Sequence, residues 1–95
     1  MRISKSQAAF LKQRIQNKLP DADVYLFGSR TNNQLKGGDI DIFVESEKKL
    51  TFQQIRDVKI SFYKRFGEQR LDIVSVVRNA TSTFRDLVLL EAIKL

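Results

Sequence analysis

The sequence contains neither cysteine nor histidine, and these two absences exclude whole classes of chemistry. Without cysteine the chain forms no disulfide and has no thiol nucleophile. Without histidine it lacks the most common general base and the usual zinc ligand. No apolar run approaches the roughly 20 residues of a membrane-spanning helix, and the N-terminal Met1–Lys5 lacks the apolar core of a secretory signal. We therefore expect a cytoplasmic protein with no membrane partner.

Acidic residues are also scarce, since 17 Lys and Arg face 11 Asp and Glu, which gives a net charge of +6. Such an excess suits a phosphate-rich partner, a nucleotide or a nucleic acid, and it equally suits a basic surface that is merely solvated. The length of 95 residues is enough for one hydrophobic core. We predict a single domain that spans residues 1–95.

Hydrophobic periodicity predicts three helices and three strands. Ser4 and Gln7 are spaced as a capping box, as are Thr51 and Gln54, and each pair marks the start of a helix. The expected helices cover residues 4–18, 51–66 and 83–95, and the expected strands cover residues 24–27, 40–44 and 70–77, with a charged connection over residues 45–49. This order predicts an α/β (α+β) fold, in which helices pack on a small mixed β-sheet.

The strand over residues 40–44 begins beside two carboxylates, Asp39 and Asp41. Their apolar neighbours Ile40 and Ile42 have the opposite parity, so both acids point to one face of the sheet while the isoleucines enter the core. Two adjacent acids repel each other unless a cation lies between them or water screens both. The pattern therefore indicates either a metal site or a solvated edge strand.

Asp72 repeats this pattern on the next strand, where Leu71 and Ile73 share one parity and Asp72 has the other. If the two strands are neighbours, Asp72 joins Asp39 and Asp41 on the same face. Three such carboxylates suit two Mg²⁺ ions about 4 Å apart, the arrangement used in phosphoryl transfer. The alternative is a strand-end acid paired with Arg70 or Arg78.

Between the first two strands lies Gly28-Ser29-Arg30. Glycine lets the backbone approach a phosphate closely, and free N–H groups together with the Ser29 hydroxyl can donate to it. Arg30 can hold a triphosphate or remain solvated. The alternative is a plain Gly-Ser turn, but the nearby Asp-x-Asp favours phosphate binding.

Taken together, Phe27-Gly28-Ser29, a spacer and Asp39-Ile40-Asp41 resemble the signature of the DNA polymerase β-type nucleotidyltransferases. Asp72 fits the third acid of that family. Two positions differ from the usual pattern: Gly38 stands where many members have serine, and Thr31 begins a segment that usually reads differently. The chain length is similar to that of the minimal nucleotidyltransferases, and the resemblance covers essentially the whole chain.

The resemblance implies a Mg²⁺-dependent enzyme that moves NMP, with AMP as the expected group, from an NTP such as ATP to a hydroxyl of a partner protein. The resemblance also implies that Asp39, Asp41 and Asp72 hold two Mg²⁺ ions and that Gly28, Ser29 and Arg30 bind the nucleotide. Minimal nucleotidyltransferases are commonly paired with a helical HEPN-type toxin, which they silence as antitoxins. Two alternatives belong to other classes: an antitoxin that acts by contact alone, and a nucleic-acid-binding domain.

The C-terminal segment is apolar beyond the needs of one helix face, because Leu87, Val88, Leu89, Leu90 and Ile93 point in several directions on a helix. A small core cannot bury all of them. Either the helix lies across the sheet, or part of the excess forms an association surface. We expect the chain to associate with a partner or with itself through this helix and the adjoining sheet edge.

Overall fold

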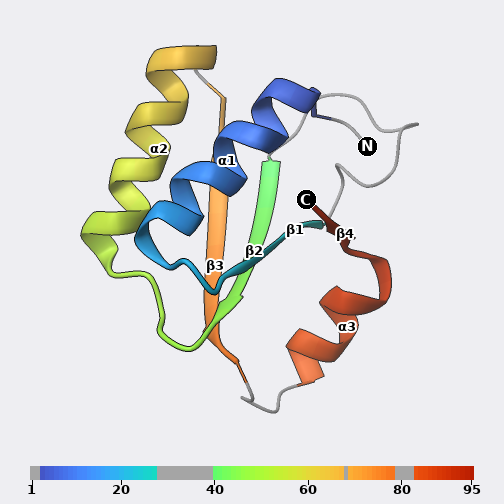
Figure 1. Cartoon of the computed structure of the whole chain (residues 1–95). Helices are drawn as coiled ribbons and strands as arrows, with labels where there is room; N and C mark the ends of the chain where they lie inside the picture. Colours follow the sequence, from blue (N-terminus) through green and yellow to red (C-terminus); the bar gives the residue numbers. More distant parts are fainter. Residues whose placement is uncertain (1–2, 28–39, 68, 79–82) are drawn as a thin grey trace.

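The computed structural model describes residues 3–27, 40–67, 69–78 and 83–95, with only the backbone described for residues 83–85 (Figure 1). Within these residues the chain forms three helices and four strands. In chain order they are α1 (Lys5–Lys18), β1 (Asp23–Phe27), β2 (Ile40–Ser46), α2 (Phe52–Phe66), β3 (Leu71–Val77), α3 (Thr83–Glu91) and β4 (Ile93–Lys94). In this part of the chain no helix is long and apolar enough to cross a membrane.

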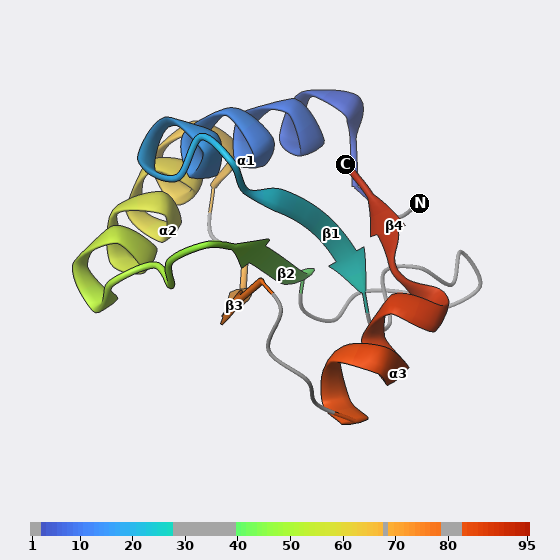
Figure 2. The same cartoon turned by 60° about the horizontal axis from the view of Figure 1, so that its bottom comes forward.

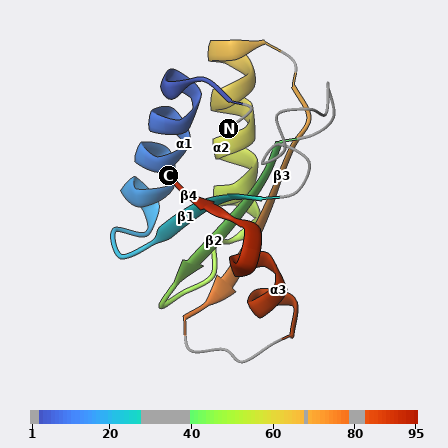
Figure 3. The same ribbon diagram turned by 90° about the vertical axis from the view of Figure 1, so that its right-hand side faces the viewer.

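The four strands form one mixed sheet with the order β3-β2-β1-β4. β2 and β3 are parallel and are connected through α2, whereas β1 is antiparallel to both β2 and β4. Helices pack on this sheet, so the predicted fold class is confirmed. The three helices divide between its two faces: α1 and α2 lie on one side and α3 on the other (Figures 2 and 3).

The main core lies between the sheet and the α1–α2 layer. Its central side chains are fully or almost fully buried: Leu11, Ile15, Val24, Leu26, Ile40, Ile42, Val44, Val58, Phe62 and Leu71. The members from β2 have the parity that the sequence predicted for the core face. Phe43, which has the opposite parity, is also fully buried, but it lies on the α3 side and outside this core. We call that second side of the sheet the open face.

Both long helices begin where the sequence predicts. Ser4 accepts a hydrogen bond from the Gln7 N–H while the Gln7 side chain accepts one from the Ser4 N–H, so the capping box of α1 is complete. Thr51 and Gln54 form the same pair at α2. Gly67 follows α2 with φ of 87°, a backbone conformation that residues with a side chain rarely adopt.

The C-terminus differs from the prediction of one helix over residues 83–95. α3 ends at Glu91, and Ile93–Lys94 instead form β4 on the edge of β1, with Ile93 opposite Leu26. The Leu95 N–H donates to the carbonyl of Val24, which continues this pairing. Alternation along an extended edge lets Leu95 pack against the core. Part of the apolar excess is buried in this way, and Ile93 does not belong to the helix face.

The predicted connection over residues 45–49 is also wrong at its start, because β2 continues through Glu45 and Ser46, which are 4 % and 0 % exposed. Polar residues at a strand end resemble a loop in sequence. Here Glu45 pairs in register with Asp23 of β1, and the Arg78 N–H bonds to the carbonyl of Ser46. These partners keep both residues in the sheet.

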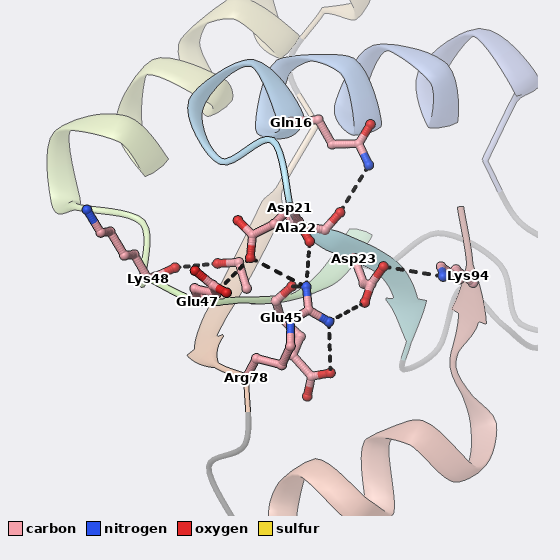
Figure 4. A network of polar contacts seen from close by, with 10 residues as sticks. Gln16, Asp21, Ala22, Asp23, Glu45, Glu47, Lys48, Arg78 and Lys94 are labelled. Carbon is pink, nitrogen blue, oxygen red and sulfur yellow. Dashed lines mark hydrogen bonds and ion pairs between the residues drawn. The ribbon is translucent and has the colours of Figure 1, made fainter.

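Arg78, which follows β3, links the ends of three strands through acidic side chains (Figure 4). Its guanidinium Nη1 donates to Asp23 Oδ2 at 2.7 Å and lies 4.0 Å from Glu45 Oε1. Nη2 is 3.6 Å from Asp21 Oδ2, and Lys94 Nζ of β4 lies 3.3 Å from Asp23 Oδ1. The network therefore ties the turn before β1 to the ends of β2, β3 and β4.

This network makes stability depend on pH. The hydrogen bond from Arg78 lowers the pKa of Asp23 below its ordinary value of 3.8, against the opposing effect of desolvation and with further help from Lys94. A carboxyl with a lower pKa in the folded state stabilises the fold above its unfolded pKa, and this contribution is lost as the pH falls through the folded pKa.

We therefore expect Asp23→Asn to lower the free energy of unfolding by roughly 1–2 kcal/mol at neutral pH. The difference in free energy of unfolding between the wild-type protein and the variant should decrease once the pH falls below about 4. Urea unfolding followed by circular dichroism at several pH values measures both effects. If this difference stayed constant down to low pH, the stabilising interaction between the Asp23 carboxylate and Arg78 would be contradicted.

Candidate active site

The sheet register brings two of the predicted acids together. In the parallel β2–β3 pair, Asp41 stands opposite Asp72, between the core pairs Ile40–Leu71 and Ile42–Ile73. Paired residues on adjacent strands point to the same face, and their backbones are about 4.8 Å apart. Both carboxylates therefore project from the open face, near the N-terminal ends of β2 and β3, and both are half-buried.

Three aromatic side chains lie next to Asp41 on the open face. Phe27, the last residue of β1, stands opposite Asp41, and Tyr25 stands opposite Phe43. The Phe27 and Phe43 rings meet edge to face with centroids 6.3 Å apart, and the Tyr25 ring lies 6.2 Å from that of Phe43. Phe43 is fully buried, so this row of rings forms an apolar contact beside the acids on the open face.

One alternative for Asp72, an ion pair with Arg78, is wrong. Asp72 is the second residue of β3, whereas Arg78 follows the last, and its guanidinium is engaged by Asp21, Asp23 and Glu45. A strand of seven residues separates the two ends of β3 by about 20 Å. The same sheet thus carries an acidic pair at one end and a neutralised acidic cluster at the other. Sequence reasoning did not identify the second cluster, whose only signal was the shared parity of Asp41 and Glu45.

Comparison with known families decides what kind of domain this is. The model of the nucleotidyltransferase domain family matches residues 8–94, nearly the whole chain. The chain belongs to this family. No curated protein matches the sequence.

Two solved structures share the nucleotidyltransferase fold of this chain. One is the tri-AMPylated Shewanella oneidensis HEPN toxin in complex with MNT antitoxin, with a TM-score of 0.64 and 17 % identity over 97 % of this chain and 71 % of the other. The second is a mutant of the toxin–antitoxin MntA–HpeT with two aspartates, two positions apart, changed to glutamate. Its TM-score is 0.68 and its identity 17 %, over 92 % of this chain and 70 % of the other. At this identity the likeness establishes the fold.

Four of the predicted site residues, Gly28, Ser29, Arg30 and Asp39, lie outside the described residues. In the sequence they adjoin the described acidic pair. Gly28 follows Phe27, the strand residue opposite Asp41, and Asp39 precedes Ile40, the first residue of β2. Their assignment to nucleotide and metal binding in this nucleotidyltransferase domain stays a prediction.

Asp41 and Asp72, the two described acids of the predicted site, fit a hard divalent cation. Asp41 and Asp72 offer only carboxylate oxygens, which suit Mg²⁺ or Mn²⁺, and the chain has no histidine or cysteine for a softer metal. Among the residues that the structure describes, no group of three His, Cys, Asp or Glu is placed to hold a metal ion. A three-carboxylate site with Asp39 as its third member is therefore a prediction from the sequence.

Proposed function

We propose that this nucleotidyltransferase domain is a Mg²⁺-dependent enzyme that transfers AMP from ATP to a hydroxyl group of a partner protein. The observation that carries the proposal is the parallel register of Asp41 and Asp72 on the open face of a nucleotidyltransferase fold. The direct test is transfer of label from the α-phosphate of ATP to the partner in the presence of MgCl₂.

In this proposal Asp39 and Asp41 hold two Mg²⁺ ions, and Asp72 completes the site of one of them. Bound Mg²⁺ supplies charge neutralisation at the phosphates during transfer. The backbone at Gly28, the Ser29 hydroxyl and the Arg30 guanidinium bind and orient the triphosphate. Most of the catalytic effect then comes from positioning and charge stabilisation.

The transfer forms one bond and breaks another. The oxygen of the acceptor hydroxyl bonds to the α-phosphorus, the bond from that phosphorus to the bridging oxygen of the β-phosphate breaks, and pyrophosphate leaves. In this proposal the Asp72 carboxylate, which is in register with Asp41, takes the proton of the attacking hydroxyl. The aromatic row of Tyr25, Phe27 and Phe43 packs on the same face of the sheet, beside Asp41.

The proposed acceptor is a HEPN-type toxin, which this domain would silence as its antitoxin. Support comes from the two solved structures of the same fold, one of which contains a tri-AMPylated HEPN toxin. The mutated aspartates of the other are two positions apart, the spacing of Asp39 and Asp41 here. The competing hypothesis is an antitoxin that acts by binding alone, without transfer of AMP. Equal silencing of the toxin by the wild-type domain and by Asp41→Asn would favour that hypothesis.

α3 offers an apolar contact for this partner. Val88 is 8 % exposed, whereas Leu87 and Leu90, three positions apart on the same side of the helix, are 61 % and 79 % exposed. Burial of a leucine contributes about 2 kcal/mol. Two exposed leucines on one helix side thus give a partner a considerable apolar contact.

We expect Leu90→Glu to weaken the complex with the HEPN-type toxin roughly 30-fold or more, with little change in melting temperature. Phe52→Glu on α2 is the control, because Phe52 is 93 % exposed and lies in the opposite layer. Analytical ultracentrifugation measures the complex and thermal melting measures the fold. Equal affinity of both variants would exclude α3 as the contact.

A further inference from the structure

The positive charge of the chain is concentrated on one layer. α1 and α2 together carry eight Lys and Arg side chains and a single acid, Asp57, for a net charge of +7. The whole chain has a net charge of +6, so the remaining residues sum to −1. This basic layer covers one side of the sheet (Figures 2 and 3), and the register of β2 and β3 directs Asp41 and Asp72 to the other side, the open face. A molecule with two such faces can bind an anion at a place distinct from its active site.

A groove crosses the basic layer between the two helices. It has a volume of about 620 Å³, and the side chains around it are mostly polar or basic. Arg14 and Arg65 stand on its two sides, and Lys64 lines its continuation toward α2. Amide and hydroxyl groups complete the lining: Ser6, Gln13, Asn17 and Ser61. Among the residues that the structure describes, no acid lines the groove.

The two arginines share one aromatic ring. Arg14 Cζ lies 5.2 Å from the centroid of the Phe10 ring and Arg65 Cζ lies 6.0 Å from it, while Arg65 also lies 5.5 Å from the ring of Phe66. The ring is itself held edge to face by Phe62 and Phe66. Two like charges thus lie against one ring, and both arginines are exposed. Their stacking on Phe10 leaves the N–H edges of both guanidiniums available for an anion.

The acids in the described part of the chain compensate this pair only weakly, because Asp57 attracts Arg14 through space without forming a salt bridge with it. There, no carboxylate lies within ion-pair distance of Arg14, Arg65 or Lys64, and the one acid of the layer, Asp57, is bound by Lys18 at 2.6 Å. A guanidinium group that has no salt bridge is free to give two parallel N–H bonds to a phosphate.

We propose that the groove between α1 and α2 binds a single-stranded polynucleotide through its phosphates, with Arg14, Arg65 and Lys64 as the phosphate contacts. Amide and hydroxyl groups along a basic groove suit nucleotides, because they both donate to and accept from base and sugar edges. A peptide partner would need apolar pockets, and in the part of the chain that the structure describes the apolar lining is limited to Ala9 and Phe10. Phosphate contacts also predict a steep dependence on salt.

The experiment measures fluorescence anisotropy of labelled 12-nucleotide RNA and DNA strands of mixed sequence with the full chain. Three phosphate contacts predict that the logarithm of the association constant falls with the logarithm of salt concentration with a slope of about −2. For Arg14→Gln/Arg65→Gln the slope should fall to about −0.7, and affinity should drop roughly 25-fold at 0.1 M salt.

The matched control is Lys48→Gln/Lys49→Gln, which removes the same charge from exposed positions between β2 and α2. It should change affinity less than about threefold, since exposed charges beyond a Debye length are largely screened. Gln13→Glu is a second probe: it places an acid in the groove without removing either arginine from Phe10, and it should also weaken binding. Thermal melting checks that every variant is folded.

Asp41→Asn separates the groove from the active site, and it should bind the strands as tightly as wild type. Three results would overturn the proposal: no binding of RNA or DNA at low salt, equal loss in the groove and control variants, or a loss with Asp41→Asn. Tighter binding to polyglutamate or to anionic lipid vesicles than to the oligonucleotides would equally overturn it, since it would assign the groove to another class of partner.

Discussion

Asp41→Asn should reduce nucleotidyl transfer roughly 10³-fold or more while the domain stays folded. Loss of a carboxylate that holds a metal ion removes several kcal/mol of charge stabilisation in the transition state. Asp41 is half-buried on the open face, outside the main core. The free energy of unfolding should therefore change by no more than about 1 kcal/mol, and relief of repulsion between Asp41 and Asp72 acts in the stabilising direction.

Melting in the presence of Mg²⁺ gives a readout independent of activity. A cation that binds only the folded state raises the melting temperature by mass action. MgCl₂ together with ATP should therefore stabilise the wild-type protein and have a much smaller effect on Asp41→Asn. Asp57→Asn makes the same chemical change on α2, where Asp57 pairs with Lys18 on the surface, and it should retain transfer. Full transfer by Asp41→Asn would exclude the proposed site.

The second large effect concerns the core. Phe62→Ala should lower the free energy of unfolding by about 3–5 kcal/mol, a large fraction of the total stability of a small domain. Phe62 is fully buried between the sheet and α1, and its ring centroid lies 4.9 Å from that of Phe66 and 6.1 Å from that of Phe10. Truncation would leave a cavity that these rings cannot fill.

Phe52→Ala is the matched control, since it removes the same ring from the same helix at a position that is 93 % exposed. It should change stability by less than about 0.5 kcal/mol. Urea unfolding followed by circular dichroism compares the two variants. Similar unfolding midpoints would contradict the assignment of the α1–α2 layer as the main core.

Local signals in the sequence were enough to predict most of the elements. Ser4–Gln7 and Thr51–Gln54 form the expected capping boxes because their hydrogen bonds involve only neighbouring residues. The alternation of Ile40, Asp41 and Ile42 predicted the core side of β2, because burial requires the isoleucines to share one face. The pairing of β2 with β3 then brought Asp41 opposite Asp72.

The errors lie where tertiary partners decide the structure. β4 has two residues, too few to show any periodicity, and it exists because the edge of β1 offers hydrogen bonds to Ile93 and Leu95. Glu45 is buried in β2, where Arg78, 33 residues further along, donates to its carbonyl and lies 4.0 Å from its carboxylate. Neither partner is visible in the local sequence, so no pattern of propensity could have identified these contacts.

The most direct test of the nucleotidyltransferase assignment uses two ATP samples, one labelled at the α-phosphate and the other at the γ-phosphate. Each is incubated with the domain, MgCl₂ and a HEPN-type protein from the same genome. We predict that α-label becomes covalently attached to the partner, that γ-label appears only in released pyrophosphate, and that Asp41→Asn abolishes both. Attachment of γ-label would indicate a kinase, and absence of any transfer to a partner that binds the domain would contradict the account.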